Sequence, residues 1–193
     1  MSENEIVGVC LLVIRALEAL GIPYELGGSM ASSLLGAPRS TRDADLVADL
    51  SPAQARTLAE SLHPDFVSNA DSAASAVVQG RSFNLIHLGT MLKVDIFPVK
   101  AGLYWRGEFA RRLRIRLPGD SATEVWCTSP EDIVLKKLVW YRDGGSVSER
   151  QWQDLLEVLR AQRGRLDEGY LSRWADDLGV AALLKQAQSQ AQT

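Results

Sequence analysis

The chain has 193 residues, 46% of them hydrophobic and 23% charged, and a formal net charge of −3. This composition excludes a chain that is disordered throughout, and the charge excludes a polycation that coats nucleic acid over its whole surface. With only two cysteines, Cys10 and Cys127, and two histidines, a disulfide framework and a cysteine-based or multi-histidine metal site are also excluded.

The first part of the chain alternates helices and strands. Apolar residues recur at three- and four-residue steps over residues 3–20, which predicts a helix that Gly21 ends. The elements predicted next are a short strand from Pro23 into a glycine turn, a small-residue helix over 29–35, a loop over 37–42 and a strand over 43–50.

The middle of the chain continues this mixed pattern. Ser51 and Pro52 predict the start of a helix that runs to about Leu62, because serine caps helix N-termini and proline fits the first turn. An alanine-rich helix is predicted over 70–79. The strands predicted after it cover 82–88 and 91–99, joined as a hairpin at Gly89-Thr90, and then 112–117 and 123–127.

The last third of the chain is helical in pattern. Helix starts are predicted at Ser129, Ser148 and Asp167 and after Gly179. The glutamine-rich tail over 186–193 is predicted to fray. We therefore expect an α/β fold of the α+β kind, in which a mixed sheet is flanked by helices. We expect it to divide into one domain over 1–128 and a helical region over 129–193 packed on that domain.

Three acidic residues stand out by their positions on predicted strands. Asp43 and Asp45 are two residues apart, so their side chains project from the same face of one strand. Asp95 lies in the middle of another apolar strand, where a carboxylate needs a cation or hydrogen bonds to offset the cost of burial. If the two strands are neighbours, three carboxylates converge and repel one another, and a divalent metal removes the repulsion. Oxygen ligands with open positions suit Mg²⁺.

A glycine turn precedes these acids. Gly27, Gly28 and Ser29 lead into a predicted helix, so a phosphate can approach the backbone there. The helix N-terminus supplies N–H groups and a positive dipole end, and Ser29 supplies a hydroxyl. The chain from Ser29 to Asp43 is long enough for a short helix and a returning loop, so a phosphate site and a metal site would share one edge of the sheet.

In this order, the motifs resemble the signature of the DNA polymerase β-type nucleotidyltransferase superfamily: a Gly-Gly/Ser turn, a helix, an Asp-x-Asp strand and a third acid on a later strand. The resemblance covers roughly residues 20–100. The sequence looks closest to small bacterial proteins related to the abortive-infection type IV toxin nucleotidyltransferases. Those proteins carry an Arg-x-Thr-x-Asp-x-Asp string and a Ser-Pro-Glu-Asp…Lys-Lys-Leu segment, and the matching segments here are 39–45 and 129–138.

The resemblance implies a nucleotidyltransferase-like domain and a metal-dependent reaction, which moves a nucleoside monophosphate from a triphosphate such as ATP to a hydroxyl and releases pyrophosphate. Asp43, Asp45 and Asp95 would be the catalytic acids and would hold Mg²⁺ or Mn²⁺, and Asp95 would also help to deprotonate the acceptor. Contacts with the nucleotide are assigned to Gly27, Gly28, Ser29, Arg39, Thr41 and Lys136. The acceptor stays open between RNA, a small molecule and a protein side chain, and an antitoxin is a candidate partner.

Plainer interpretations remain open for several of these residues. An Asp-x-Asp pair alone is common where a strand end faces water, and two glycines alone can form an ordinary turn. Arg39 is equally well explained as a solvated loop arginine, and Thr41 as a residue that orders its own loop. Lys136 and Lys137 are adjacent on a helix, so at most one of them faces the sheet.

Five arginines fall close together, at Arg106, Arg111, Arg112, Arg114 and Arg116. A solvated strand face and a track for a polyanion both explain the last three. We favour the solvated face, because no aromatic residue is interleaved to stack nucleic-acid bases. Elsewhere, Trp140, Trp152 and Trp174 are expected in the core, and Asp154 is expected in a structural salt bridge.

Two other functions compete with nucleotidyl transfer. One is a catalytically silent relative that keeps the fold to bind a nucleotide or a partner within a toxin–antitoxin pair, and the three intact acids speak against it. The other is a nucleotide-sugar glycosyltransferase, in which an Asp-x-Asp also holds a metal. Residues 1–40 supply too little chain for the nucleotide-binding sheet of that class.

No membrane segment is expected. The longest apolar stretch, 6–20, contains Arg15 and Glu18 and falls short of the roughly 20 residues that a spanning helix needs. The first residues are acidic where a signal peptide would be basic. We therefore expect a cytoplasmic protein.

Overall fold

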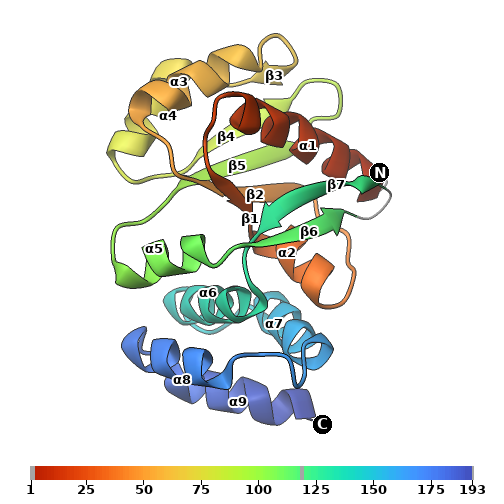
Figure 1. The fold of residues 1–193 in the computed structure, drawn as a ribbon, viewed down its shortest axis with the longest axis vertical. Helices are drawn as coiled ribbons and strands as arrows, with labels where there is room; N and C mark the ends of the chain where they lie inside the picture. Colours follow the sequence, from red (N-terminus) through yellow and green to blue (C-terminus); the bar gives the residue numbers. More distant parts are fainter. Residues whose placement is uncertain (1–2, 118–119, 193) are drawn as a thin grey trace. The chain divides into compact units, whose positions relative to one another are not determined.

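The computed structural model describes residues 3–117 and 120–192, which divide into two compact units. The first unit combines the described chain up to Met30 with Ser40–Cys127, and the second combines Ala31–Arg39 with the chain from Thr128 onward. The predicted fold class is confirmed, because the described residues form one mixed seven-stranded sheet accompanied by helices (Figure 1). That 1–128 is a separate domain stays a prediction.

The sheet belongs to the first unit. Its strands are β1 (Tyr24–Leu26), β2 (Asp43–Ala48), β3 (Phe66–Val67), β4 (Phe83–His87), β5 (Lys93–Pro98), β6 (Leu113–Leu117) and β7 (Asp120–Cys127), in the spatial order β3-β4-β5-β2-β1-β7-β6. β2 lies at the centre, parallel to β5 and antiparallel to β1. β4 and β5 form the predicted antiparallel hairpin.

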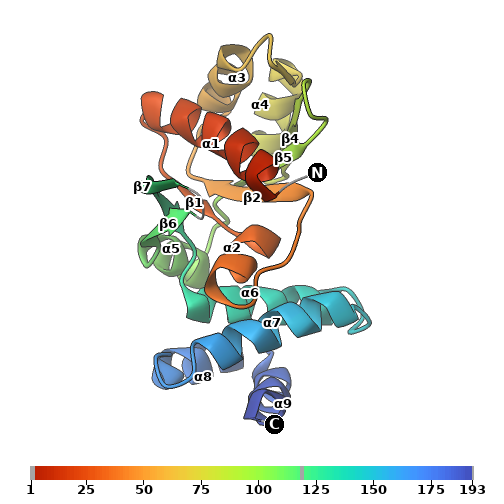
Figure 2. The ribbon, with the colours of Figure 1, turned by 90° about the vertical axis from the view of Figure 1, so that its right-hand side faces the viewer.

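One face of this sheet packs into an apolar core. The helices of the first unit are α1 (Glu3–Ala19), α3 (Pro52–Ser61), α4 (Ala70–Val78) and α5 (Leu103–Ala110). Figures 1 and 2 show α1, α3 and α4 together on one side of the sheet. Ala44, Leu46 and Ala48 alternate along β2 and are fully buried, so the intervening residues of β2 project from the opposite face.

Local sequence signals explain where the α3 helix begins. The Ser51 hydroxyl accepts a hydrogen bond from the Gln54 main-chain N–H at 3.3 Å, and the Gln54 side chain accepts one from the Ser51 N–H at 2.9 Å. This reciprocal capping satisfies two N–H groups that the helix itself leaves without a partner. The predicted helix start is confirmed.

The second unit is helical and includes a short piece of the N-terminal half. Helix α2 (Gly28–Leu35) begins in the first unit and ends in the second, which also holds α6 (Pro130–Asp143), α7 (Glu149–Ala161), α8 (Glu168–Asp177) and α9 (Ala181–Gln192). The Gln162 side chain donates a hydrogen bond to the Leu35 carbonyl at 2.8 Å. A Cβ atom on Gly36 would lie 2.9 Å from the Val158 main-chain nitrogen. Close packing and this hydrogen bond therefore hold 31–39 against α7.

Two predictions about the last third of the chain are wrong. The glutamine-rich tail is helical to Gln192, because Ala187 and Ala191 are buried and Trp152 donates to the Gln190 side chain at 2.7 Å. Alanines spaced four residues apart supply an apolar stripe that the polar composition hides. Trp140 is 39% exposed rather than part of the core.

Two short elements escaped prediction, the helix α5 and the strand β3. Helix α5 has no side-chain cap, and β3 is only two residues long, so neither leaves a local pattern to detect. No helix in the described part of the chain has both the length and the apolar character that crossing a membrane requires.

Candidate active site

The three acids lie on adjacent strands and on the same face of the sheet. β2 and β5 run parallel, with Asp45 directly opposite Asp95 and Asp43 directly opposite Lys93. Because side chains alternate along a strand, Asp43, Asp45 and Asp95 all project away from the face that packs into the core. The structure therefore places all three acids on one face of the sheet, whereas sequence spacing could relate only Asp43 and Asp45.

A lysine is the immediate partner of the third acid. The Lys93 ammonium lies 2.7 Å from the Asp95 carboxylate, and the two side chains are 37% and 18% exposed. Among the described residues, no three His, Cys, Asp or Glu side chains stand close enough to form a ready-made metal site. In this arrangement, the Asp95 carboxylate is paired with the Lys93 ammonium and does not bind a cation together with Asp45.

Asp45 is a partly buried carboxylate with two other carboxylates nearby. Burial raises its pKa, and the negative charges of Asp95 and Asp43 raise it further. A hydrogen bond from the Ser29 main-chain N–H and the positive charge of Lys93 act in the opposite direction, but the net shift is upward. The cluster thus carries more negative charge than its surroundings neutralise.

The glycine turn lies directly against this acid. The Gly27 N–H donates to the Asp45 carbonyl at 2.8 Å, and Gly28 adopts a φ of +55° as α2 begins. A Cβ atom on Gly28 would lie 1.8 Å from an Asp45 carboxylate oxygen. Only glycine therefore fits at this position, for reasons of both conformation and space.

The donor set of the cluster fits a hard divalent cation. Asp43, Asp45 and Asp95 offer only carboxylate oxygens, which are the ligands that Mg²⁺ and Mn²⁺ prefer. A divalent cation would also neutralise the repulsion that raises the pKa of Asp45. Lys93 contacts one oxygen of the Asp95 carboxylate, so its ammonium would compete with a metal ion for that acid.

Arg39 and Thr41, which we assigned to nucleotide contacts, both make structural contacts within the protein. The Arg39 guanidinium holds the Asp154 carboxylate through two nitrogens, at 2.5 and 2.6 Å. The Thr41 hydroxyl donates to the Asp43 carbonyl at 3.1 Å, so it orders the loop that leads into β2. These contacts favour the plainer interpretation of Thr41, whereas Arg39 is not a solvated loop arginine but part of an ion pair. Contact of either residue with nucleotide stays a prediction.

The two adjacent lysines of α6 behave differently. Lys137 is buried, and its ammonium lies 2.9 Å from Asp154 and 2.8 Å from the Gln151 side-chain oxygen. The Lys136 ammonium lies 3.4 Å from the Thr128 hydroxyl, and its contact with a phosphate stays a prediction. The expected structural salt bridge of Asp154 is confirmed, with two cationic partners instead of one. Burial would raise the pKa of Asp154, but hydrogen bonds from Arg39 and Lys137 hold it below its usual value.

Three residues near the acids were missed by sequence reasoning. Lys93 is the partner of Asp95, and Asn84 of β4 is exposed directly opposite Asp95. Glu25 of β1 is fully buried and lies opposite Val47, so it projects from the same face as Asp45. A charged residue inside the apolar segment Tyr-Glu-Leu was a signal for Glu25. Lys93 was marked by strand parity, because it precedes Asp95 by two residues on one strand, whereas Asn84 matters only through strand register.

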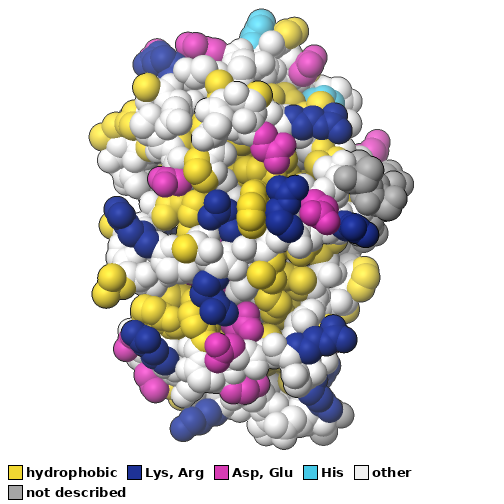
Figure 3. Space-filling view, viewed as in Figure 1, with side chains coloured by type: hydrophobic (Ala, Val, Ile, Leu, Met, Phe, Trp, Pro, Cys, Tyr) yellow, Lys and Arg dark blue, Asp and Glu magenta, His cyan; other side chains and the backbone are white. Residues whose placement is uncertain are grey.

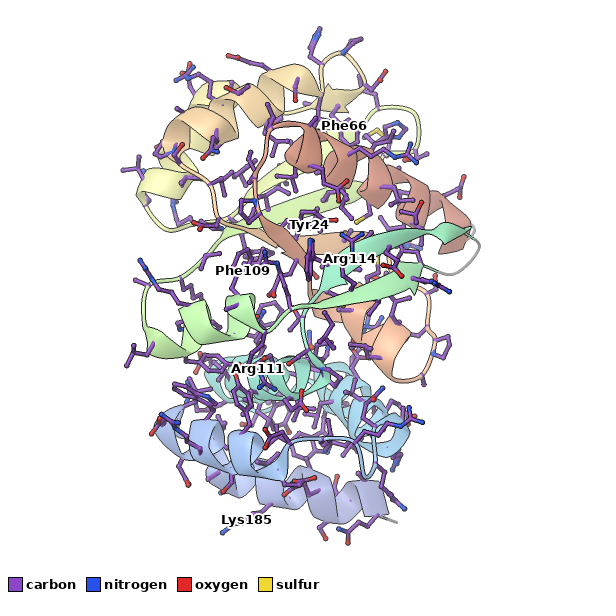
Figure 4. All side chains as sticks on the ribbon, in the orientation of Figure 1. Tyr24, Phe66, Phe109, Arg111, Arg114 and Lys185 are labelled. Atoms are coloured by element: carbon purple, nitrogen blue, oxygen red, sulfur yellow. The ribbon has the colours of Figure 1, made fainter. Side chains whose placement is uncertain are left out.

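Aromatic rings lie close to the arginines in β6 and just before it. The Arg112 and Arg114 guanidinium groups lie 4.8 and 5.2 Å from the ring centre of Trp126 on β7, and Arg112 also lies 4.5 Å from the Phe109 ring. Figure 4 shows Phe109 on α5 and Arg114 on β6, and Figure 3 shows basic and acidic side chains side by side over this strand pair. Arg116 pairs with Glu124 at 3.3 Å. Contrary to our expectation, aromatic rings do lie beside these arginines, because Trp126 comes from the neighbouring strand and Phe109 from α5.

Comparison with known proteins identifies the fold. No protein-family model and no curated protein matches the sequence. Among solved structures, an antigenic nucleotidyltransferase-like protein from Paracoccidioides brasiliensis is similar, with 19% identity over 98% of this chain and 94% of that chain and a TM-score of 0.59. The chain has a nucleotidyltransferase-like fold.

Two structures of an antibiotic-resistance factor, ANT(2″)-Ia, agree with this assignment. Its solution structure shares 14% identity, with 98% of this chain and 100% of that chain covered and a TM-score of 0.54. Its complex with adenylyl-2″-tobramycin shares 15% identity, with 93% and 97% covered and a TM-score of 0.53. The predicted likeness to the nucleotidyltransferase superfamily is confirmed at the level of the fold, and the closer likeness to abortive-infection toxins stays a prediction.

Proposed function

We propose that the protein is a metal-dependent nucleotidyltransferase that moves a nucleoside monophosphate from a triphosphate to a hydroxyl acceptor. One observation carries the proposal: Asp45 lies opposite Asp95 on a parallel strand, with Asp43 on the same face and the Gly28 turn against the Asp45 carboxylate. A fold shared with nucleotidyltransferases supports the proposal. The plain alternative, a solvated acid pair, leaves the contact between the glycine turn and Asp45 without a reason.

The proposed roles follow from position. Asp43 and Asp45 would hold Mg²⁺ or Mn²⁺, and Asp95 would complete the ligand set. When bound, the metal ions would neutralise charge on the reacting phosphate and on the leaving group. Ser29 orients Asp45 through its main-chain N–H, and the Gly27-Gly28 backbone at the start of α2 would receive the triphosphate.

The chemical step exchanges one phosphorus–oxygen bond at the α-phosphate for another. The acceptor oxygen attacks the α-phosphorus, and the bond from that phosphorus to the bridging oxygen of the β-phosphate breaks. Pyrophosphate leaves with the electron pair of that bond, and the hydroxyl proton passes to the Asp95 carboxylate. The chain contributes mainly by holding these groups in line and by balancing charge.

We further propose ATP as the donor and leave the acceptor to experiment. The antibiotic-resistance factor has been solved with adenylyl-2″-tobramycin, an adenylylated small molecule, which makes aminoglycosides one acceptor class to test. RNA and protein hydroxyls are the other two. The likeness to abortive-infection toxins adds an antitoxin partner to the hypothesis, and a stable complex with the product of a neighbouring gene would support that part.

Pyrophosphate release tests the proposal. The purified protein would be mixed with each nucleoside triphosphate, Mg²⁺ or Mn²⁺ and a panel of acceptors, and triphosphate binding would be measured in parallel. Asp95→Asn should lower pyrophosphate release by about 10²–10³-fold while triphosphate binding largely survives. Asp43→Asn should weaken both, because it removes a ligand of the metal that anchors the triphosphate.

Asp49→Asn is the matched control, since Asp49 is an exposed acid just beyond the end of the same strand. This variant should behave like the wild type. Triphosphate binding without pyrophosphate release from any acceptor would favour the catalytically silent alternative. Full activity of Asp95→Asn would refute the role given to that residue.

A further inference from the structure

Lys93 is the cation nearest to the acid cluster along β5. It lies opposite Asp43 in the strand register, and its ammonium contacts Asp95 at 2.7 Å. Its side chain is 37% exposed, so the ammonium also faces solvent. The ion pair therefore joins a partly exposed cation to an acid that the proposed reaction needs.

The charges of the cluster explain why a cation is held there. Asp43, Asp45 and Asp95 project from one face, and a single ammonium leaves this group of carboxylates with an excess of negative charge. A triphosphate is itself strongly anionic, so it would be repelled from the cluster unless cations accompany it. A divalent cation satisfies the carboxylates, but it has to compete with Lys93 for Asp95.

We propose that Lys93 is an exchangeable counter-ion, which pairs with Asp95 in the ligand-free protein and moves onto the triphosphate when metal and nucleotide bind together. The inference rests on the proposed function and adds a triphosphate-contacting residue to it. A merely structural ion pair within β5 would instead stay in place, and it would contribute little at this degree of exposure.

This exchange makes metal and nucleotide bind cooperatively. Metal alone binds weakly, because it has to separate Lys93 from Asp95 with no new partner for the ammonium. When a triphosphate is present, the displaced ammonium gains a phosphate, so each ligand strengthens the binding of the other. Removing the ammonium should therefore tighten metal binding and weaken triphosphate binding, which are opposite effects of a single substitution.

The experiment measures binding rather than turnover. Mn²⁺ is titrated into the wild type and Lys93→Met without nucleotide, and free Mn²⁺ is followed by its electron paramagnetic resonance signal. A non-hydrolysable ATP analogue is then titrated with and without Mn²⁺. We expect Lys93→Met to bind Mn²⁺ about tenfold more tightly than the wild type and the analogue about tenfold more weakly in the presence of Mn²⁺, a size typical of coupling between sites.

Two further variants make the test specific. Lys100→Met removes a lysine just after the same strand, where the ammonium lies 4.4 Å from the Trp105 ring, and it should match the wild type in both titrations. Lys93→Gln keeps a polar stem and should reproduce Lys93→Met if that variant folds poorly, as judged by its melting temperature.

The outcomes separate the inference from the function beneath it. If both Lys93 variants bind Mn²⁺ and the analogue as the wild type does, the inference is wrong, while pyrophosphate release by the wild type would still support nucleotidyl transfer. If the wild type binds neither ligand and releases no pyrophosphate, the proposed function fails and the inference fails with it.

Discussion

Replacing Gly28 by alanine should disable the candidate site through the acid that it touches. A Cβ atom at Gly28 would lie 1.8 Å from an Asp45 carboxylate oxygen, 2.5 Å from Cγ and 2.8 Å from Cβ of the same side chain. Rotation of the carboxylate relieves only the first two contacts, because the Asp45 Cβ is fixed to the backbone of β2. The acid and its strand therefore have to move together.

Gly21→Ala supplies the control for backbone strain. Gly21 has a φ of +63°, close to the +55° of Gly28, and no heavy atom within 4 Å of an added Cβ. A left-handed conformation costs an alanine about 1–2 kcal/mol, which both variants share. Crowding at Gly28 adds about 1–3 kcal/mol. At roughly 3 °C per kcal/mol for a chain of this size, Gly28→Ala should lower the melting temperature by about twice as much as Gly21→Ala.

The functional difference should be larger than the difference in stability. A shift of about 1 Å in a positioning group can cost ~10²-fold in rate, so Gly28→Ala should lose about that factor in pyrophosphate release. Gly21→Ala should keep nearly full activity at temperatures where it is folded. Equal melting temperatures and equal activities for the two variants would refute the contact between Gly28 and Asp45 on which this reasoning depends.

Three other predictions concern the helical unit and the thiols. Asp154→Asn removes the carboxylate that lies 2.9 Å from the buried ammonium of Lys137 and should destabilise the protein by about 3 kcal/mol, seen as a lower melting temperature. The pKa of Asp154 is lowered in the folded state, so its ion pairs stabilise the protein above the unfolded-state pKa, and this stabilisation is lost as the pH falls through the folded-state pKa. The difference in melting temperature between the wild type and Asp154→Asn should therefore disappear in acid. A difference that stays constant with pH would contradict the ion pair. Burial and the charge of Asp45 raise the pKa of the Cys10 thiol to about 12, and Cys127 is also buried, so a thiol reagent should label neither until denaturant is added. Deleting residues 187–192 should lower the melting temperature by several degrees, since it removes buried alanines of α9; an unchanged value would mean that the tail contributes nothing.

Much of the candidate site was predictable because its signals are local. Side chains two residues apart on a strand project from the same face, so backbone geometry alone predicts that Asp43 and Asp45 share a face. A carboxylate in the apolar segment around Asp95 signals an unusual environment, and glycines before a helix signal a close approach of the backbone. Each of these inferences needs only a few neighbouring residues.

The neighbours of these residues across strands and helices were not predictable, because strand register and helix packing decide them. Strand parity alone puts Lys93 and Asp95 on one face, but only the register of β5 beside β2 sets Lys93 opposite Asp43. Arg39 is bound by Asp154, 115 residues away along the chain. No local pattern marks that contact in advance.

Local sequence signals were enough to predict the types of most elements, the helix start at Ser51 and the identity of the three acids, since capping, periodicity and strand parity are short-range effects. Long-range packing sets which strands are neighbours, that Trp126 lies beside Arg112 and Arg114, and that the tail packs as a helix. These features depend on which apolar surfaces bury each other across the whole chain, and that choice is made by the free energy of the complete fold rather than by any single segment.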